Sequence, residues 1–214
     1  MSVLVHKNFL SEEDRIFFLN HVNKNLANFQ NNPNGPNRKY LRLDNTYFFD
    51  QKHFEYLIKI SEYLGIKEPK VDPMLGILYS NISKGGFIHL HVDSHPPYHE
   101  NEFVNYRFNL MLNRGDGDSY DPIVRKEKYE VNTGDAWSFP ASLYSHETQP
   151  VDGEEPRIVL QFGFILHKKE YEHLFNDNEL ILTKRMKEYY EKNTRNGIAR
   201  SRKNFFGQSA EIVP

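Results

Sequence analysis

The sequence predicts one mainly β domain with flanking helices, and three observations support this fold class. Six runs rich in apolar, β-branched and aromatic residues fall between residues 75 and 166, turns rich in Gly, Asn and Asp separate them, and helical patterns precede and follow them. Several short strands with regular turn signals are typical of a β-sandwich or barrel. A length of 214 residues suits a single domain.

The N-terminal part, about residues 1–70, is predicted to supply helices that flank the β core. Val3–Leu10 resembles a short strand and turn. Ser11 can cap a first helix, and the acidic residues that follow it lie at the positive end of the helix dipole. The remaining elements expected here are a loop over Gln30–Arg38, an extended segment over Tyr40–Asp50 and a helix over His53–Leu64 that Gly65 ends.

The β core is predicted over about residues 71–167, and a helical, basic extension over about 168–214. The predicted strands are Leu75–Ile82, Phe87–Asp93, Phe103–Asn113, Lys128–Val131, Ala136–Phe139 and Arg157–Leu166. In the extension, Lys184–Lys203 contains eight Lys or Arg residues against two Glu residues. A basic run of this kind is more often a solvated helix or chain end than a nucleic-acid contact.

Composition excludes several kinds of site. The chain has no cysteine, so zinc–thiolate sites, iron–sulfur clusters, disulfides and thiol nucleophiles are excluded. The net charge of −2 argues neither for a nucleic-acid binder nor for a membrane-surface protein. With no signal-peptide pattern and no long apolar run, we expect a soluble protein of a reducing compartment, the cytoplasm.

The tripeptide His91-Val92-Asp93 is the most informative motif. If Phe87–Asp93 is a strand, His89, His91 and Asp93 share one polar face, and Ile88, Leu90 and Val92 share an apolar face. Three ionisable groups that point into a barrel require compensation, and a metal ion provides it. The alternative is a polar, solvent-facing edge strand.

Two residues further along the chain extend this motif. His146 lies 53 residues after Asp93, and Arg157 lies 11 residues after His146. Two imidazoles and one carboxylate can bind one face of a ferrous ion and leave the other face open. An arginine can bind the carboxylate of a co-substrate through two parallel hydrogen bonds.

These residues resemble the iron(II)- and 2-oxoglutarate-dependent dioxygenase superfamily, in its prolyl-hydroxylase-like branch. The resemblance runs from about Val5 to Leu166. It is carried by Asn8-Phe9-Leu10-Ser11-Glu12-Glu13, Leu78-Tyr79, Lys84-Gly85-Gly86-Phe87, His91-Val92-Asp93, Gly134 through His146, and Arg157. It implies a double-stranded β-helix, which is a jelly-roll or cupin-like fold, with N-terminal helices and a C-terminal helix.

The resemblance also implies the chemistry. His91, Asp93 and His146 would bind Fe(II), and Arg157 would bind the distal carboxylate of 2-oxoglutarate. Decarboxylation of this co-substrate to succinate, with dioxygen, would drive hydroxylation of an unactivated C–H bond. Related halogenases lack the carboxylate that Asp93 supplies, so oxidation is favoured over halogenation. Collagen-type prolyl hydroxylases commonly have lysine in place of Arg157, which weakens any assignment of proline as the substrate.

Further site residues are predicted from strand alternation and from the resemblance. Tyr79 aligns with a family tyrosine that hydrogen-bonds the distal carboxylate, and Asn109 could contact the proximal one. Arg107 would hold the co-substrate or an acidic substrate. Tyr98 and His99 could form one wall of the substrate pocket. His89 is interpreted as a buried histidine satisfied by backbone, and Trp137 as a core residue.

Three functions remain open at this point. The first is a hydroxylase acting on an amino-acid side chain, either of a protein-bound prolyl or other residue or of a free amino acid. The second is a nucleic-acid-directed oxidative demethylase. Against it, the alkylation-repair branch has a second arginine six residues after the first, where this chain has Gly163. The third is a non-catalytic jelly-roll binding module, which would be expected to lack a ligand.

Overall fold

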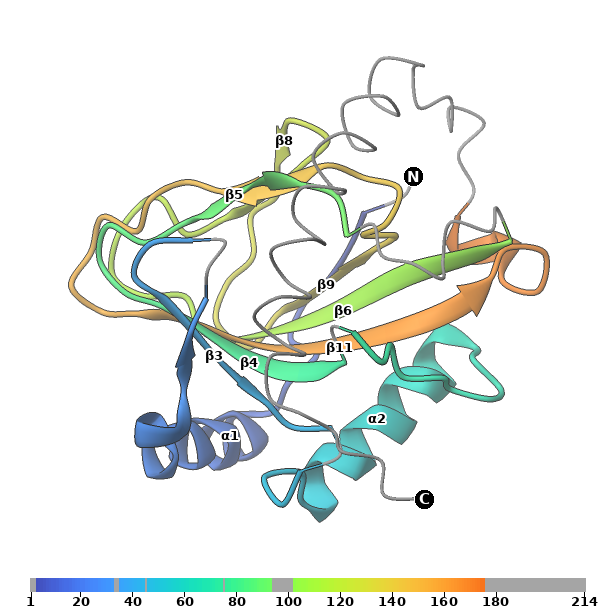
Figure 1. Ribbon diagram of the computed structural model, residues 1–214, viewed down its shortest axis with the longest axis horizontal. Coiled ribbons are helices and arrows are strands. Elements are labelled where there is room, and N and C mark those ends of the chain that lie inside the picture. The colour runs from blue at the N-terminus through green and yellow to red at the C-terminus, as the bar shows by residue number, and fades with distance from the viewer. Residues whose placement is uncertain (1–2, 33–34, 45, 75, 94–101, 176–214) are drawn as a thin grey trace, which may run out of the picture.

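The computed structural model describes residues 3–32, 35–44, 46–74, 76–93 and 102–175. Its strands form two sheets that face each other, with both helices outside one of them (Figure 1). The large sheet has the strand order β1-β9-β6-β11-β4-β3-β2, and the small sheet has the order β5-β10-β7-β8. All the strand pairs are antiparallel, as in a β-sandwich.

The helices are α1 (Glu12–Lys24) and α2 (Gln51–Leu64), with 3-10 turns at Leu26–Asn28 and Glu172–Leu174. The large sheet contains β1 (Leu4–His6), β2 (Gln30–Asn31), β3 (Arg38–Arg42), β4 (Ile77–Ile82), β6 (Phe103–Asn113), β9 (Ala136–Phe139) and β11 (Arg157–His167). The small sheet contains β5 (Ile88–His91), β7 (Pro122–Val124), β8 (Glu127–Lys128) and β10 (His146–Thr148). The first 70 residues are therefore not only helical, because they supply three strands of the large sheet.

The first helix begins at its predicted cap, Ser11, whereas α2 begins two residues before the predicted His53, with Asp50 as its cap. The Ser11 hydroxyl accepts a hydrogen bond from the Asp14 amide at 3.2 Å, and the Asp50 carboxylate accepts one from the His53 amide at 3.1 Å. Gly65 ends α2 with a φ of 71°, a left-handed conformation that favours glycine. None of the helices in the described part of the chain is long and apolar enough to cross a membrane.

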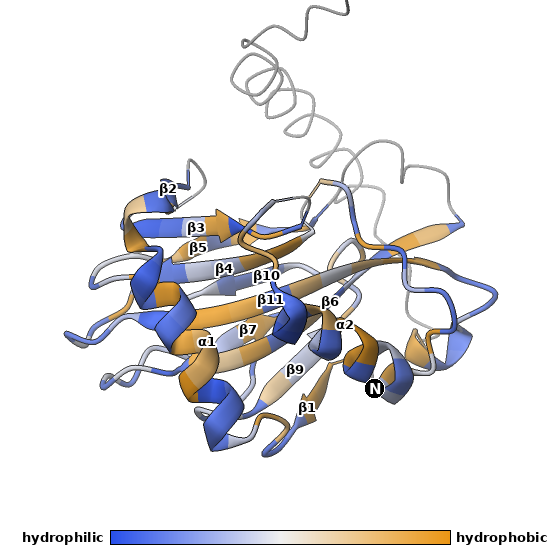
Figure 2. Ribbon diagram, turned by 90° about the horizontal axis from the view of Figure 1, so that it is seen from below, coloured by the Kyte–Doolittle hydropathy of each residue, from blue (hydrophilic) through white to orange (hydrophobic). Residues whose placement is uncertain are grey.

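Strand alternation gives the large sheet an apolar outer face and an inner face that carries both apolar and polar side chains. The apolar face packs against α1 and α2, whose position across the sheet is visible in Figure 2 together with the hydrophobic residues along β11. Its members include Leu41, Ile77, Tyr79, Phe108, Leu110, Leu160 and Phe162. Because side chains alternate, Ser80, Arg107, Asn109, Arg157 and Gln161 project from the opposite face, toward the small sheet.

The space between the two sheets is apolar in one part and polar in another. Met111, Trp137 and Phe139 of the large sheet pack with Val124 and Tyr144 in a second core cluster. The arginines and the carboxylates of the inner face lie outside this cluster. The division leaves a polar region between the sheets, and the predicted metal ligands are found there.

The edge strand β5 corrects one sequence-based expectation. It ends at His91, and both His89 and Leu90 are exposed, Leu90 to 53%. The pairing of β5 with β10 is irregular, since His91 pairs with His146 but Ile88 pairs with Thr148. The predicted apolar and polar faces are therefore wrong at Leu90 and His89, because these neighbours point to opposite sides of β5 and both are in solvent at this edge of the sheet.

Candidate metal and co-substrate site

His91, Asp93 and His146 lie together between the two sheets. His91 is the last residue of β5, His146 is the first of β10, and the two pair directly across the sheet. Asp93 follows two residues after His91, and its Oδ1 lies 3.3 Å from His91 Nε2 and 3.9 Å from His146 Nε2. The ligand atoms of all three residues lie within 4.8 Å of one another, as a shared metal ion requires.

The hydrogen bonds of the two histidines fix which nitrogen faces Asp93. His91 Nδ1 lies 2.7 Å from the His89 carbonyl oxygen, and His146 Nδ1 lies 3.0 Å from the Tyr144 carbonyl oxygen. A carbonyl oxygen only accepts, so each Nδ1 carries the proton and each Nε2 of the neutral ring carries a lone pair. Three acceptors therefore converge with no donor among them, an arrangement that a cation stabilises.

The protonation states suit metal binding. Burial, together with the nearby His91, lowers the pKa of His146 to about 3. Burial opposes ionisation of Asp93, but Arg107 and the neighbouring imidazoles outweigh it and hold the pKa of Asp93 well below its ordinary value. At neutral pH, His146 is thus unprotonated and Asp93 is ionised, which are the forms that bind a metal.

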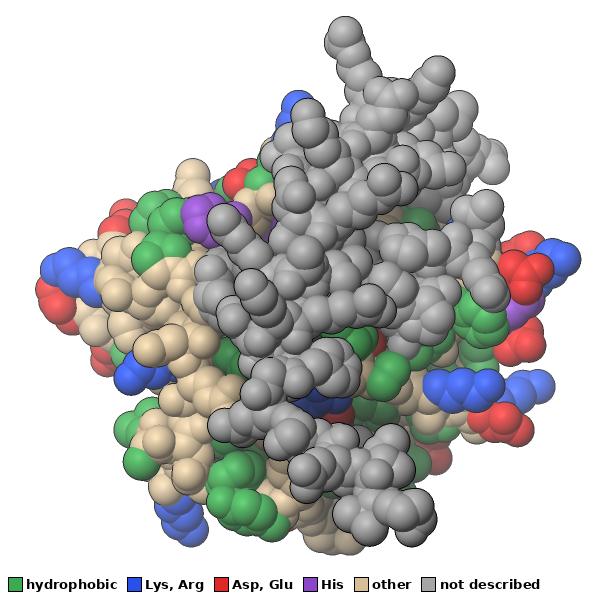
Figure 3. Space-filling model, viewed as in Figure 1, with side chains coloured by type: hydrophobic (Ala, Val, Ile, Leu, Met, Phe, Trp, Pro, Cys, Tyr) green, Lys and Arg blue, Asp and Glu red, His purple; other side chains and the backbone are tan. Residues whose placement is uncertain are grey.

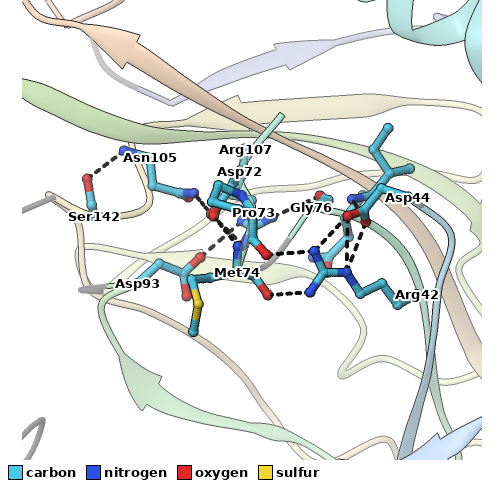
Figure 4. Close-up of polar contacts among 12 residues, drawn as sticks. Arg42, Asp44, Asp72, Pro73, Met74, Gly76, Asp93, Asn105, Arg107 and Ser142 are labelled. Carbon is cyan, nitrogen blue, oxygen red and sulfur yellow. Dashed lines mark hydrogen bonds and ion pairs between the residues drawn. The ribbon is translucent and has the colours of Figure 1, made fainter. Parts of the chain in front are cut away.

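Arg107 fixes the orientation of Asp93. Its Nε donates to Asp93 Oδ2 at 3.0 Å, and its terminal nitrogens lie 3.8 Å from Asp72 Oδ2 and 3.4 Å from the Gly76 carbonyl oxygen. Asp72 in turn accepts hydrogen bonds from the Asn105 side chain and the Met74 amide, as Figure 4 shows. Oδ2 of Asp93 is thereby engaged, and Oδ1 is left to face the imidazoles.

This placement changes the interpretation of Arg107. The sequence predicted that Arg107 would bind the co-substrate or an acidic substrate, but its guanidinium is occupied by Asp93 and Asp72. Gly163 lies beside it on β11, and a Cβ at Gly163 would lie 2.3 Å from a terminal nitrogen of Arg107. Glycine at this position therefore makes room for the arginine of the neighbouring strand.

Arg157 is a buried cation without a carboxylate partner among the described residues. It is 2% exposed, its guanidinium lies 5.4 Å from the centre of the Trp137 ring, and its Nε has no hydrogen-bond partner. Burial and the charge of Arg38 lower its pKa to about 10, so it is still charged at neutral pH. An unpaired buried guanidinium is costly, and the carboxylate of a bound ligand would compensate it.

Asn109 lies on the same inner face, with its amide already engaged. Its Nδ2 donates to the Trp137 carbonyl oxygen at 3.3 Å, and its Oδ1 accepts from Gln161 Nε2 at 3.0 Å. Trp137 is buried in the second core cluster, where the sequence placed it. Tyr98 and His99 lie outside the described residues.

Tyr79 lies on the other face of the large sheet. Its hydroxyl is 2.8 Å from Nε2 of His53 on α2, and its ring packs near His21 of α1. The prediction that Tyr79 and Ile77 share one face of their strand is correct, but that face packs against the helices and not against the small sheet. The predicted contact between Tyr79 and the co-substrate is therefore not retained.

Sequence reasoning missed two features. Arg38 of β3 lies on the inner face and donates through Nε to Ser80 Oγ at 3.2 Å. A second cluster, His21, Asp50 and His53, lies at the helices and again brings two imidazoles and a carboxylate within 4.8 Å. The helical spacing of His53 from Asp50 could have indicated the cluster, but the approach of His21 depends on the packing of α1 against α2.

Comparison with known proteins places the fold. The sequence matches no protein-family model and no curated protein. Solved structures do match: a prolyl-4-hydroxylase of Pseudomonas putida has a TM-score of 0.59 at 14% identity, over 78% of this chain and 92% of that chain. A collagen prolyl hydroxylase of Paramecium bursaria Chlorella virus-1, in complex with 2-oxoglutarate, has a TM-score of 0.59 at 14% identity, over 77% of this chain and 96% of that chain.

A third match is a Trichoplax adhaerens prolyl hydroxylase in complex with a hypoxia-inducible-factor peptide fragment. Its TM-score is 0.58 at 12% identity, over 80% of this chain and 86% of that chain. The chain therefore has the fold of prolyl hydroxylases and other 2-oxoglutarate–Fe(II) oxygenases. This similarity confirms the predicted jelly-roll class, and the helices that precede the core are α1 and α2. Most of the predicted C-terminal helix, with its basic run, falls on residues 176–214, outside the described residues.

Proposed function

We propose that the chain is an Fe(II)- and 2-oxoglutarate-dependent dioxygenase that hydroxylates an unactivated C–H bond. The observation that carries this proposal is the convergence of two Nε2 lone pairs and the Asp93 carboxylate on one point. Two histidines and one carboxylate are the ligand set of non-haem Fe(II) oxygenases. The unpaired Arg157 then offers a partner for the second carboxylate of a 2-oxo acid.

Each residue has a distinct task in this proposal. His91, Asp93 and His146 would hold Fe(II), which together with 2-oxoglutarate and dioxygen would supply the oxidation and release succinate. Arg107 keeps Asp93 in one orientation, so that a single oxygen faces the metal. Arg157 would orient the co-substrate by its distal carboxylate, and Asn109, on the same face, would donate its second Nδ2–H to the proximal one.

The proposed substrate is an amino-acid side chain, either of a protein-bound prolyl or other residue or of a free amino acid. One structural neighbour was solved with a peptide fragment, which supports a polypeptide. A nucleic-acid-directed demethylase has no specific observation in its favour among the described residues. In Figure 3, the described charged side chains that are visible lie mainly toward the margins of the view, with Lys or Arg next to Asp or Glu on both sides.

Succinate formation tests the proposal. The protein is incubated anaerobically with Fe(II) and 2-oxoglutarate, oxygen is admitted, and succinate is measured with and without candidate amino acids and peptides. We expect succinate above the level of a His91→Ala control, because that variant loses a ligand but keeps the fold. Equal succinate from the two proteins would contradict the oxygenase assignment and favour a binding module.

A further inference from the structure

Three arginines and two carboxylates face the polar region between the sheets. Arg107 is compensated by Asp93 and Asp72. Asp121, which is also buried, pairs with Arg114 and Lys128 at 3.5 and 3.7 Å, and its charge acts on Arg157 from beyond ion-pair distance. Arg157 and Arg38 have no ion pair within the described part of the chain.

The arginines of this region thus outnumber the carboxylates that pair with them, and binding of the proposed cofactors does not change this excess of positive charge. Fe(II) and the doubly charged 2-oxoglutarate together add no net charge. The co-substrate would compensate Arg157, so one cation, Arg38, would still lack a counter-ion. Buried charges in proteins are normally paired, and an unpaired one points to a missing partner.

The strand register places the side chain of Arg38 on the inner face of the large sheet, the face that also carries Arg107 and Arg157. Arg38 and Arg157 both pair with Ile82 across the sheet, so their side chains share the inner face. Burial lowers the pKa of Arg38 to about 10, and the charges of Asp93 and Arg107 also act on it. Its hydrogen bond to Ser80 uses Nε and leaves the two terminal nitrogens for another acceptor.

Arg38 is also partly exposed at the surface. It lines a hollow of about 410 Å³ at the β2–β3 hairpin, next to Asn31, Asn37, Lys39 and Ser83. The described lining contains two cations, three side-chain amides, one hydroxyl and no carboxylate. Such a lining suits a polar ligand that carries a negative charge.

We propose that this hollow admits the substrate and that Arg38 binds an oxyanion of the substrate, a carboxylate or a phosphate, close to the metal site. The proposal rests on the oxygenase function and narrows it to an anionic substrate. A free amino acid or an acidic side chain carries the required carboxylate. The oxyanion would pair with the terminal nitrogens of Arg38, while Ser80 holds Nε and so fixes the plane of the guanidinium.

Anion titration tests the proposal without knowledge of the substrate. Acetate and inorganic phosphate serve as carboxylate and phosphate probes, and each is titrated into protein loaded with Zn(II) and 2-oxoglutarate. The NMR signal of the Arg38 Nε–H group reports binding. We expect a saturable shift for at least one probe, with a dissociation constant on the order of 1–10 mM for a single charged contact. The probe that binds identifies the kind of oxyanion.

Matched variants decide what the signal means. Calorimetry measures anion binding to the variants, and Arg38→Gln should weaken it by at least about tenfold. Lys39→Gln, which removes the other cation of the hollow, should have less effect, and Arg38→Lys should recover part of the affinity. Absence of a saturable shift in the wild-type protein, or equal binding by Arg38→Gln, would overturn the proposal.

A last measurement separates this inference from the oxygenase proposal. Arg38→Gln should leave the affinity for 2-oxoglutarate within about twofold of wild type, whereas Arg157→Gln should weaken it strongly. If both variants weaken it equally, Arg38 belongs to the co-substrate site and the inference is wrong. If the wild-type protein does not bind 2-oxoglutarate at all, the oxygenase proposal fails, and the same anion titration of metal-free protein still tests Arg38.

Discussion

The molecule contains two clusters of two histidines and one aspartate, and they differ in how their donors and acceptors are arranged. At His53 both ring nitrogens are engaged, Nε2 by the Tyr79 hydroxyl and Nδ1 by Asp50 at 2.6 Å. Asp50 also caps α2. At His91 and His146, backbone carbonyls hold each Nδ1, and both Nε2 atoms face Asp93.

The comparison shows that residue types alone do not define a metal site. In the helix cluster, a chain of hydrogen bonds from Tyr79 through His53 to Asp50 engages both nitrogens of His53 and leaves only Nε2 of His21 without a partner among the described residues. In the cluster between the sheets, three acceptors meet without a donor, and Arg107 orients the carboxylate from behind. We therefore expect the second arrangement to bind Fe(II) and the first to stabilise the fold.

The largest expected effect is the loss of metal binding. His146→Ala should abolish tight binding of one divalent ion per chain, because it removes one of three protein ligands. His53→Ala should leave the stoichiometry unchanged and instead destabilise the fold. Equilibrium dialysis with Co(II), combined with thermal unfolding, measures both. Metal loss in His53→Ala, with retention in His146→Ala, would reverse the roles of the two clusters.

The next largest effect concerns Arg157. Arg157→Gln should weaken 2-oxoglutarate binding by about 30- to 100-fold, because a buried charge-assisted pair contributes roughly 2–3 kcal/mol. Metal binding should stay nearly the same, since Trp137 and not a metal ligand lies against Arg157. Calorimetry on Zn(II)-loaded protein measures the first quantity, and dialysis measures the second. If Arg157→Gln weakened metal binding as much as 2-oxoglutarate binding, Arg157 would not act on the co-substrate alone, and its assigned role would be wrong.

Arg107 should have a smaller effect on the metal. Arg107→Gln leaves Asp93 free to rotate and should lower metal affinity by about tenfold, which is typical for a residue that orients a ligand. Gly163→Ala should act in the same direction, because its methyl group would displace the Arg107 guanidinium. The two variants sharpen the comparison, since the ion-pair partners of Asp50 among the described residues are His21 and His53, and neither is an arginine. Unchanged metal affinity in both variants would show that the orientation of Asp93 does not depend on Arg107.

The smallest effect is a pH dependence of stability that comes from the helix cluster. Burial lowers the pKa of His53 from 6.5 to about 4, so the unfolded chain binds more protons between these values. His53 therefore contributes stability above pH 6.5 that is lost as the pH falls toward 4, on the order of 1–3 kcal/mol. Urea unfolding of metal-free protein should show a flatter pH slope for His53→Gln. Identical slopes would exclude this contribution.

Much of the fold could be predicted because long strands and capped helices leave local signals. The bounds of β6 and β9 match the predicted runs, and Ser11 and Gly65 lie at the helix ends where the sequence placed them. The strands β7 and β10 have three residues each and were not predicted as strands. Runs this short show no periodicity.

Part of the site was also predictable, because the metal-ligand motif and strand alternation are local signals in the sequence. The sequence brought His91, Asp93 and His146 together as a hypothesis, and the structure places them within one ligand sphere. Alternation correctly grouped Tyr79 with Ile77, but it does not say which face of a sheet the helices cover. Arg38 was missed because its position depends on the pairing of β3 with β4, about 40 residues apart in the chain.

The most direct test of the central claim is whether the metal ligands and Arg157 act on one co-substrate. Anaerobic calorimetry compares 2-oxoglutarate binding to Fe(II)-loaded protein, metal-free protein and loaded Arg157→Gln. We expect one 2-oxoglutarate per chain for the loaded wild-type protein, and an affinity at least about tenfold lower when either the metal or the arginine is removed. Equal affinity in all three samples would contradict the account.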